Sequence, residues 1–441
     1  MTKEFEAQQY NDLGLNALLE GNFEVALQNF NEALKLEPNM VGVIYNRANL
    51  YSILQNSDNA IADYNLATEL EPDYYEAYVN RGIVYLEQKQ DAHAAISDFT
   101  KAIEIDPAQV QAHFNRANAY SFLDNYGAAI GDISKAIEIA PNNKVVYVNR
   151  GYLFFRIRNY NAALADFSKA IRIDPDFSEA YLNRGDTYQQ LGQPQAALND
   201  YAAVIELENV NPKNIAAAHA RRGEILESLG ELAAAFTEYD RAIELLPDEH
   251  FLQHKRGGLL CQLGQLTEAL QHYDRAISLD DSCIHCYAER AWIKENIKDI
   301  AGAIADWNKV IERSPNSLTP YLERGKLYYQ QNQYKAAKAD YKKAITISPE
   351  DPRFYVARAE TNLMLDYPTA ALKDCNQAIK LAPDFAPAYF VRALAKLRSS
   401  NVMSALDDAN RSANLFEAEG NLERHQDCLN LIKEIWLPHS D

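Results

Sequence analysis

Prolines recur about every 34 residues along nearly the whole sequence, and this spacing constrains the fold more than any other feature. The missing member of the series would fall at Asp281. A period of roughly 20 to 50 residues indicates repeated units that each contact only their neighbours. The length of 441 residues therefore predicts a continuous solenoid rather than several globular domains. The series consists of Pro38, Pro72, Pro107, Pro141, Pro175, Pro212, Pro247, Pro315, Pro349 and Pro383.

Counting back from each proline divides residues 1–417 into twelve predicted units after a short N-terminal stretch. A one-residue insertion near Gln90 and a three-residue insertion within 208–214 interrupt the period, and we expect the second to make a local bend. Residues 418–441 are predicted to form a capping helix and a short tail, with Leu422, Leu429, Ile432 and Trp436 at helical spacing. The predicted units span 7–40, 41–74, 75–109, 110–143, 144–177, 178–215, 216–249, 250–283, 284–317, 318–351, 352–385 and 386–417.

Small and aromatic residues occupy fixed positions in every unit. In the unit that begins at Lys144, position 8 is Gly151, position 20 is Ala163 and position 24 is Phe167. Position 8 is Gly or Ala, and position 20 is Ala, in all twelve units, so two antiparallel helices can approach closely. Proline at position 32 then stops the second helix. This pattern resembles the tetratricopeptide repeat (TPR) family over residues 7 to 417, which implies an all-α fold, a right-handed superhelical solenoid of about twelve helix-turn-helix units.

Arginine stands at position 7 of eleven units, where the family normally has an apolar residue, and an acid stands at position 23 of ten. The two positions lie at nearly the same level of an antiparallel hairpin. We therefore predict a series of structural ion pairs, with planar and bidentate geometry. The alternative is an arginine-lined groove for an acidic ligand, but the recurring acids would neutralise it. Representative pairs are Arg81 with Asp98, Arg150 with Asp166, and Arg184 with Asp200.

Asparagine at position 6 is the better functional lead. The family resemblance implies that positions 2, 5, 6, 9, 12 and 13 of each first helix line a concave groove. Position 6 carries five successive asparagines, a run similar to that in the TPR superhelix of O-linked N-acetylglucosamine transferase, although this chain has no room for that enzyme's catalytic domain. An amide offers both a donor and an acceptor to a peptide backbone. The run consists of Asn46, Asn80, Asn115, Asn149 and Asn183.

Charged and aromatic residues extend this predicted peptide-binding surface. Position 6 continues with Arg221, Lys255 and Glu289, and aromatic side chains that the core does not require are expected at Tyr45, Phe114 and Trp292. The alternative interpretation is that the asparagines are solvated residues, copied with their unit by duplication.

Cys283 and Cys286 form the one CxxC motif of the sequence. Zinc would need four ligands, and no second such motif exists, so we expect ordinary cysteines, no metal and no cofactor. A metal or redox role at this pair is a weak alternative. The sequence also has no phosphate-binding glycine loop or nucleophile elbow, and we expect no enzymatic activity.

The formal net charge of −19 disfavours nucleic acid and anionic membrane as partners. No apolar stretch approaches the length of a signal peptide core or a membrane span, so we expect a cytoplasmic location and no membrane insertion. The favoured function is a protein–protein interaction scaffold or assembly factor that binds extended or helical segments in the groove. The main alternative is a structural subunit that uses its convex or terminal surfaces in a larger complex. The sequence does not predict an oligomeric state.

Overall fold

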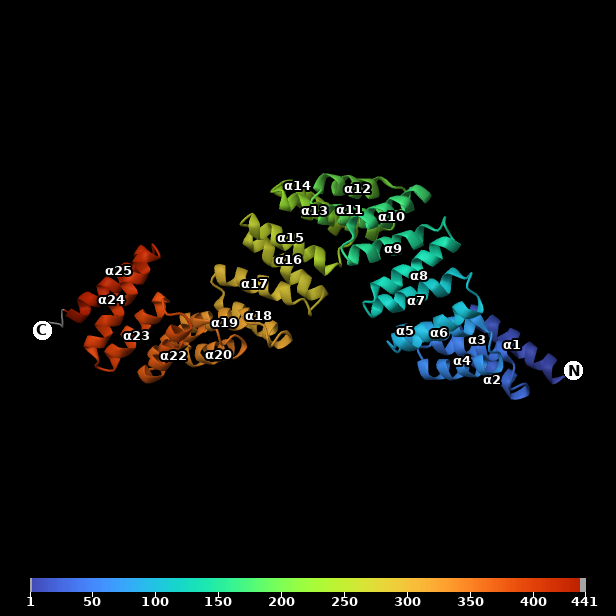
Figure 1. Cartoon of the computed structure of the whole chain (residues 1–441), viewed down its shortest axis with the longest axis horizontal. Coiled ribbons are helices and arrows are strands. Elements are labelled where there is room, and N and C mark those ends of the chain that lie inside the picture. Colours follow the sequence, from blue (N-terminus) through green and yellow to red (C-terminus); the bar gives the residue numbers. More distant parts are fainter. Residues whose placement is uncertain (1, 437–441) are drawn as a thin grey trace. The chain divides into compact units, whose positions relative to one another are not determined.

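The computed structural model of the protein describes residues 2–436, in which every regular element is an α-helix (Figure 1). The chain divides into two compact units, with the boundary between Leu229 and Gly230. Within each unit, an odd-numbered helix packs against the next even-numbered helix as an antiparallel hairpin, and successive hairpins stack. The all-α, TPR-like class that the sequence predicts is therefore confirmed.

The first unit contains thirteen of the described helices. They are α1 (Lys3–Leu19), α2 (Phe23–Leu36), α3 (Val41–Ile53), α4 (Ser57–Leu70), α5 (Tyr75–Glu87), α6 (Ala92–Ile105), α7 (Val110–Phe122), α8 (Tyr126–Ile139), α9 (Lys144–Arg156), α10 (Tyr160–Ile173), α11 (Ser178–Gln190), α12 (Pro194–Glu206) and α13 (Pro212–Ser228).

The second unit contains the remaining twelve. They are α14 (Leu232–Leu245), α15 (His250–Gln262), α16 (Leu266–Leu279), α17 (Ile284–Asn296), α18 (Ile300–Arg313), α19 (Thr319–Gln330), α20 (Tyr334–Ile347), α21 (Pro352–Met364), α22 (Pro368–Leu381), α23 (Ala386–Arg398), α24 (Val402–Ala418) and α25 (Leu422–Trp436).

Short turns with a common chemistry join the two helices of a hairpin. One residue of the turn takes a positive φ, such as Gly192 at 68° or Arg158 at 61°. In several hairpins an Asn or Asp side chain then caps the even-numbered helix: Asn159 accepts from the backbone N–H of Ala162. This cap satisfies an N–H that the first turn of a helix leaves without a partner.

Except at Pro212, proline follows the end of an even-numbered helix where the sequence predicts it. Helix α10 ends at Ile173, and Asp174, which precedes Pro175, is extended with φ −138° and ψ 101°. Where the proline is missing, Asp280 has almost the same conformation, φ −141° and ψ 100°. Its carboxylate accepts from the N–H and the hydroxyl of Ser282, so a local side-chain turn replaces the proline.

The hairpin core explains the small residue at position 8. Seven repeats have glycine at this position, and at six of them a Cβ built there would lie 2.4 to 3.0 Å from the aromatic ring at position 24. Gly185 and Tyr201 make the tightest of these contacts, at 2.4 Å. Alanine occupies position 8 in the other hairpins, as in the repeat with Ala117 at position 8 and Ile133 at position 24, which are both buried.

The two insertions have different structural outcomes. Gln90 has a φ of 55° and lengthens the turn between α5 and α6. The place of Pro212 in the series predicts that it ends a helix. It instead begins α13, because α12 already ends at Glu206. A proline is compatible with the first turn of a helix, where its missing N–H has no intrahelical partner. The unit boundary at Leu229 and Gly230 then falls inside the predicted repeat 216–249.

The last helix covers the end of the second unit with a face that agrees with the prediction at Ile432 and differs from it at Leu422 and Trp436. Helix α25 packs on α24 through the buried side chains of Cys428 and Leu431. Leu422 and Trp436, which we expected on this face, are 72% and 65% exposed. Helical spacing alone did not distinguish two neighbouring apolar stripes. The predicted tail, 437–441, lies outside the described residues.

Candidate functional site

The odd-numbered helices form the inner layer of each unit. Successive odd-numbered helices contact one another directly, as α3 does with α5 and α21 does with α23, whereas the even-numbered helices of the described residues show no comparable contacts. The layer whose helices lie closer together faces the inside of a curved stack. We call the surface of the odd-numbered helices the inner face, and the predicted binding positions lie on these helices.

The first two asparagines of the predicted run bond to the preceding repeat. Asn46 donates from Nδ2 to Oδ1 of Asn11 at 3.0 Å. Asn80 donates to the hydroxyl of Tyr45 and to Oδ1 of Asn49, both at 2.9 Å. These amides therefore link neighbouring repeats and are not simply solvated.

The next three asparagines behave differently. Asn149 and Asn183 donate to the backbone carbonyls of Val145 and Glu179 in their own helices, both at 2.8 Å. Asn115 is buried; its Oδ1 accepts from Gln111. Its Nδ2 has no hydrogen-bond partner among the described residues.

Position 5 of the preceding repeat explains the difference. It supplies an acceptor to Asn46 and Asn80, as Asn11 and Tyr45 respectively. The corresponding residues before Asn149 and Asn183 are Phe114 and Val148, whose side chains accept no hydrogen bond. Each of these amides therefore turns to its own helix.

The three charged residues that follow the asparagines at position 6 make different contacts from one another. Arg221 pairs through Nε with Oδ1 of Asp186 at 2.8 Å, and burial raises the pKa of that carboxyl. The Lys255 ammonium lies 5.2 Å from the centre of the Phe251 ring. Glu289 is exposed. The pairing of Arg221 reduces the charge that it can present to a peptide.

Two of the three predicted surface aromatics also pack in the protein. The Tyr45 ring lies 5.0 Å from the Tyr74 ring, and Phe114 packs against the buried cluster that contains Ile133 and Tyr147. The expectation that the core does not require them is therefore wrong for both. Trp292 is 39% exposed and remains available on the inner face, although its ring meets that of Trp307 edge-on at 5.8 Å.

The arginines at position 7 meet the aspartates at position 23 in nine hairpins. In each, Nε and Nη2 of the arginine donate to the two carboxylate oxygens over 2.5 to 2.9 Å. The hydrogen bonds to Asp166 raise the pKa of Arg150. The pairs are Arg47–Asp63, Arg81–Asp98, Arg116–Asp132, Arg150–Asp166, Arg184–Asp200, Arg290–Asp306, Arg324–Asp340, Arg358–Asp374 and Arg392–Asp408.

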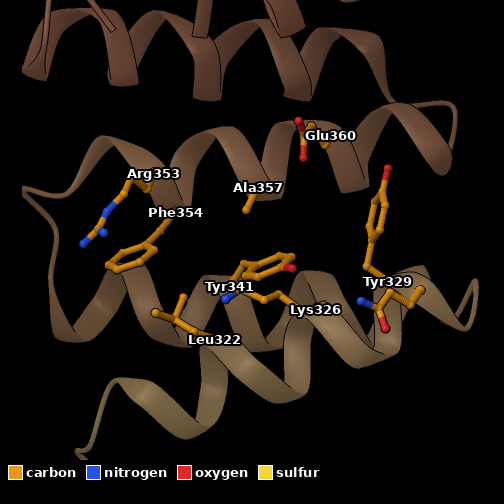
Figure 2. Close-up of a pocket in the computed structure, with 9 residues that line it drawn as sticks. Leu322, Lys326, Tyr329, Tyr341, Arg353, Phe354, Ala357 and Glu360 are labelled. Carbon is orange, nitrogen blue, oxygen red and sulfur yellow. The ribbon is translucent and has the colours of Figure 1, made fainter. Parts of the chain in front are cut away.

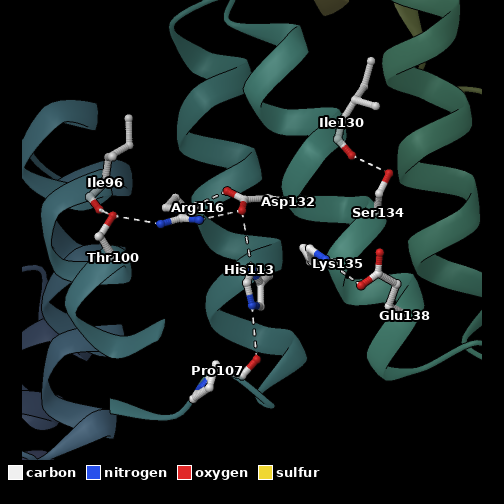
Figure 3. Close-up of polar contacts among 10 residues, drawn as sticks. All are labelled: Ile96, Thr100, Pro107, His113, Arg116, Ile130, Asp132, Ser134, Lys135 and Glu138. Carbon is white, nitrogen blue, oxygen red and sulfur yellow. Dashed lines mark hydrogen bonds and ion pairs between the residues drawn. The ribbon is translucent and has the colours of Figure 1, made fainter. Parts of the chain in front are cut away.

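The same arginines also reach back to the preceding hairpin, a contact that our sequence reasoning missed. Figure 3 shows Arg116 between Asp132 of its own hairpin and Thr100 of the one before, whose hydroxyl also donates to the carbonyl of Ile96. Nη1 of the arginine donates to position 25 of the preceding repeat, which is Asn, Ser, Thr or Asp. The recurring polar residue at position 25 was the sequence signal that could have predicted this contact. The acceptors are Asn31, Asn65, Thr100, Ser134, Ser168, Asp274, Asn308 and Asn376.

One arginine lacks an acid at position 23 and pairs with an aspartate of the preceding repeat. Arg256 pairs through Nε with Asp240 at 2.7 Å. His272, which replaces the acid, instead lies with Nδ1 2.8 Å from Oε1 of Gln253. The pairing chemistry therefore follows the residues that are present and not the position alone.

The cysteine pair differs from our expectation of ordinary thiols. Cys283 and Cys286 form a disulfide across the first turn of α17, and Cys286 is buried. The described residues contain no group of three or more His, Cys, Asp or Glu side chains that is placed to hold a metal ion. None of the described helices is long and apolar enough to cross a bilayer.

A cavity of about 420 Å³ opens on the inner face between α19 and α21 (Figure 2). Most of its lining residues stand at the predicted binding positions of two successive repeats, but in the second unit and not along the asparagines. The residues at these positions are visible in the sequence, but we did not predict a site there from the sequence. The lining consists of Leu322, Lys326, Tyr329, Gln330, Tyr341, Arg353, Phe354, Ala357 and Glu360.

Family models agree with the repeats seen in the structure. Models described as TPR repeat match residues 159–192 and 325–366, and models described as tetratricopeptide repeat match 41–74, 75–109, 110–143 and 182–250. Together these matches cover more than half of the chain. The chain belongs to the tetratricopeptide repeat family.

Curated relatives of this TPR protein match it over a short segment. DnaJ homolog subfamily C member 7 of Homo sapiens is 35% identical over 81 residues, which is 18% of this chain and 16% of the relative. Protein SGT1 homolog of Oryza sativa subsp. japonica is 32% identical over 80 residues, 18% of this chain and 22% of the relative. The matched segment thus spans about a fifth of either relative.

Solved structures match this chain at low sequence identity. The crystal structure of YrrB, a TPR protein with an unusual peptide-binding site, is 24% identical, covers 44% of this chain and 97% of its own, and gives a TM-score of 0.37. Yeast Tom70 is 16% identical and covers 99% of this chain and 96% of its own, with a TM-score of 0.35.

Proposed function

We propose that this TPR protein is a non-enzymatic scaffold or assembly factor that holds an extended or helical segment of a partner protein along its inner face. The observation that carries the proposal is the cavity between α19 and α21. Its walls include Leu322, Ala357 and Tyr329, at positions 5, 6 and 12 of their repeats. Apolar and aromatic side chains at a recessed site suit the anchoring of a partner side chain.

The amides of the first unit support a second contact area on the same type of surface. Asn149 and Asn183 use one donor each within their own helices. Their Oδ1 atoms and remaining N–H groups are left for a peptide backbone. Asn46 and Asn80 bond to the preceding repeat and support the stacking of repeats, so the proposed partner-binding surface does not include them.

Photocrosslinking from two positions of one repeat tests the proposal. Benzoylphenylalanine placed at Ala357 lies in the cavity, whereas the same residue at Lys373, an exposed position of α22, lies on the opposite layer and serves as the control. After irradiation in a lysate of the source organism, crosslinked segments are sequenced by mass spectrometry.

We expect the Ala357 variant to label a reproducible set of polypeptide segments, which excess unlabelled wild-type protein displaces. The Lys373 variant should not label them. Equal labelling from both positions, or labelling that wild-type protein does not displace, would contradict binding at the inner face.

A double substitution tests the first unit. Asn149→Ala together with Asn183→Ala should weaken the captured partner while the helix content, measured by circular dichroism, stays unchanged. If the double variant still captures a partner that crosslinks at Ala357 as well as wild type does, these amides are not part of the binding surface.

A further inference from the structure

The cavity between α19 and α21 has one carboxylate without a partner. Figure 2 shows Arg353 and Phe354 at one end of the cavity and Glu360 and Tyr329 at the other. Glu360 receives no hydrogen bond or ion pair from any residue that the structure describes. A carboxylate in such surroundings loses hydration without gaining a compensating contact.

The two cations of the cavity wall are already paired elsewhere. Lys326 donates to both carboxylate oxygens of Glu323, at 3.0 and 3.1 Å. Arg353 forms hydrogen bonds with Asp351 over 2.5 to 3.0 Å. Each cation is thus neutralised by its own carboxylate partner, so neither Lys326 nor Arg353 balances the negative charge of Glu360.

Groups from the surrounding helices offset that charge only in part. Tyr341, from α20, is 5% exposed, and burial raises the pKa of its phenol above the ordinary value, so the group is neutral. Arg424, from α25, lowers the pKa of Glu360 by less than burial raises it, and its guanidinium lies over the Phe390 and Phe416 rings at 5.2 and 5.7 Å.

We propose that the cavity between α19 and α21 receives a basic side chain, lysine or arginine, of the bound polypeptide and pairs its cation with Glu360. This inference rests on the proposed function and names the chemistry of the partner at one point of the inner face. The rings of Tyr329, Tyr341 and Phe354 line the same cavity and favour a cation that lies against them.

Other occupants fit the cavity less well. An apolar side chain would remove more water from Glu360 and leave it unpaired. An acidic side chain would add repulsion between like charges in a partly desolvated site. Burial already raises the pKa of the Glu360 carboxyl, and a bound cation would reverse this change.

Peptide pools of defined composition test the inference on the full-length protein. Each immobilised pool consists of short random peptides with one fixed central residue: lysine, arginine, norleucine, glutamine or glutamate. Binding of labelled wild-type protein is compared with that of Glu360→Gln, which keeps the shape of the side chain and removes its charge. Glu268→Gln is the matched control, because it makes the same charge change at an exposed position of α16, an even-numbered helix of the same unit.

We expect wild-type protein and Glu268→Gln to prefer the lysine and arginine pools to the norleucine pool. Glu360→Gln should lose that preference, with a decrease of about tenfold or more in affinity for the basic pools. Retention of the preference in Glu360→Gln, or equal binding of all pools, would overturn the inference and leave peptide binding intact. Failure of every pool to bind would contradict the proposed function as well.

A free small amine carries the same kind of cation as a basic side chain and is therefore the competing ligand for this cavity. Added 1,4-diaminobutane, compared with sodium chloride at equal ionic strength, shows which ligand the site takes. Modest competition that depends on Glu360, alongside retained selection of basic peptides, agrees with the proposal. Tight binding of the amine without any preference among the peptide pools would overturn it.

Discussion

Arg150 donates two hydrogen bonds to Asp166 across its own hairpin and a third to Ser134 of the hairpin before it. One planar side chain thus connects three helices. Because the same arrangement recurs along both units, the ion pairs set the spacing between neighbouring repeats as well as the pairing of the two helices within each repeat. The polar residue at position 25 is part of this arrangement.

Removal of one partner of such a pair should destabilise the protein. We expect Arg150→Leu to lower the free energy of unfolding by about 3 to 5 kcal/mol, because Asp166 would be left buried without a cation. Urea unfolding followed by circular dichroism measures the change. The double variant Arg150→Leu, Asp166→Leu is the control and should recover part of the loss. A single variant as stable as the wild type would contradict the pairing.

One repeat offers the opposite test, a gain of stability. Arg358 has Lys342 at the position where its neighbours have an asparagine or serine, and its Nη1 makes no hydrogen bond there. We expect Lys342→Asn to stabilise the protein by about 0.5 to 1.5 kcal/mol, because it supplies an acceptor and removes a like charge. Lys343→Asn, one residue further along α20, is the control and should give no comparable gain. An unchanged unfolding midpoint in Lys342→Asn would show that position 25 contributes little.

The sequence could predict the hairpins and the ion pairs because each depends on residues that recur with the period. Arg150 and Asp166 are both present in the repeat, and the antiparallel geometry brings them together. The partners of the asparagines were not predictable from position 6 alone. Asn80 and Asn149 occupy equivalent positions, but Tyr45 offers an acceptor to the first and Phe114 offers none to the second.

The cavity was missed for a related reason. Glu360 becomes distinctive only when Lys326 and Arg353 are seen to pair with other carboxylates. A sequence shows the charges at each position but not which of them neutralise one another. The disulfide of Cys283 and Cys286 likewise depends on the distance between two side chains, and a CxxC spacing is compatible with free thiols too.

Two asparagine substitutions should separate a structural amide from an available one. Asn80→Ala removes hydrogen bonds to Tyr45 and Asn49, so we expect a loss of about 1 to 2 kcal/mol in the free energy of unfolding. Asn149→Ala removes only a bond to its own helix and should change stability by less than about 0.5 kcal/mol. Thermal and urea unfolding of both variants measure the difference. If both variants lost the same stability, the contact with the preceding repeat would have no special weight.

The Glu360 carboxyl should give the second unit a recognisable pH dependence. Burial raises its pKa in the folded protein, so the folded state binds this proton more tightly than the unfolded state does. The contribution of Glu360 to stability is therefore most favourable below its unfolded pKa and is lost as the pH rises through the folded value. We expect Glu360→Gln to be more stable than wild type at about pH 7, and the difference to shrink as the pH is lowered toward about 4. Urea unfolding over this range measures it, with Glu289→Gln as the exposed control. A difference that stayed constant with pH, or a destabilised Glu360→Gln at neutral pH, would mean that the carboxylate has a partner in the folded protein.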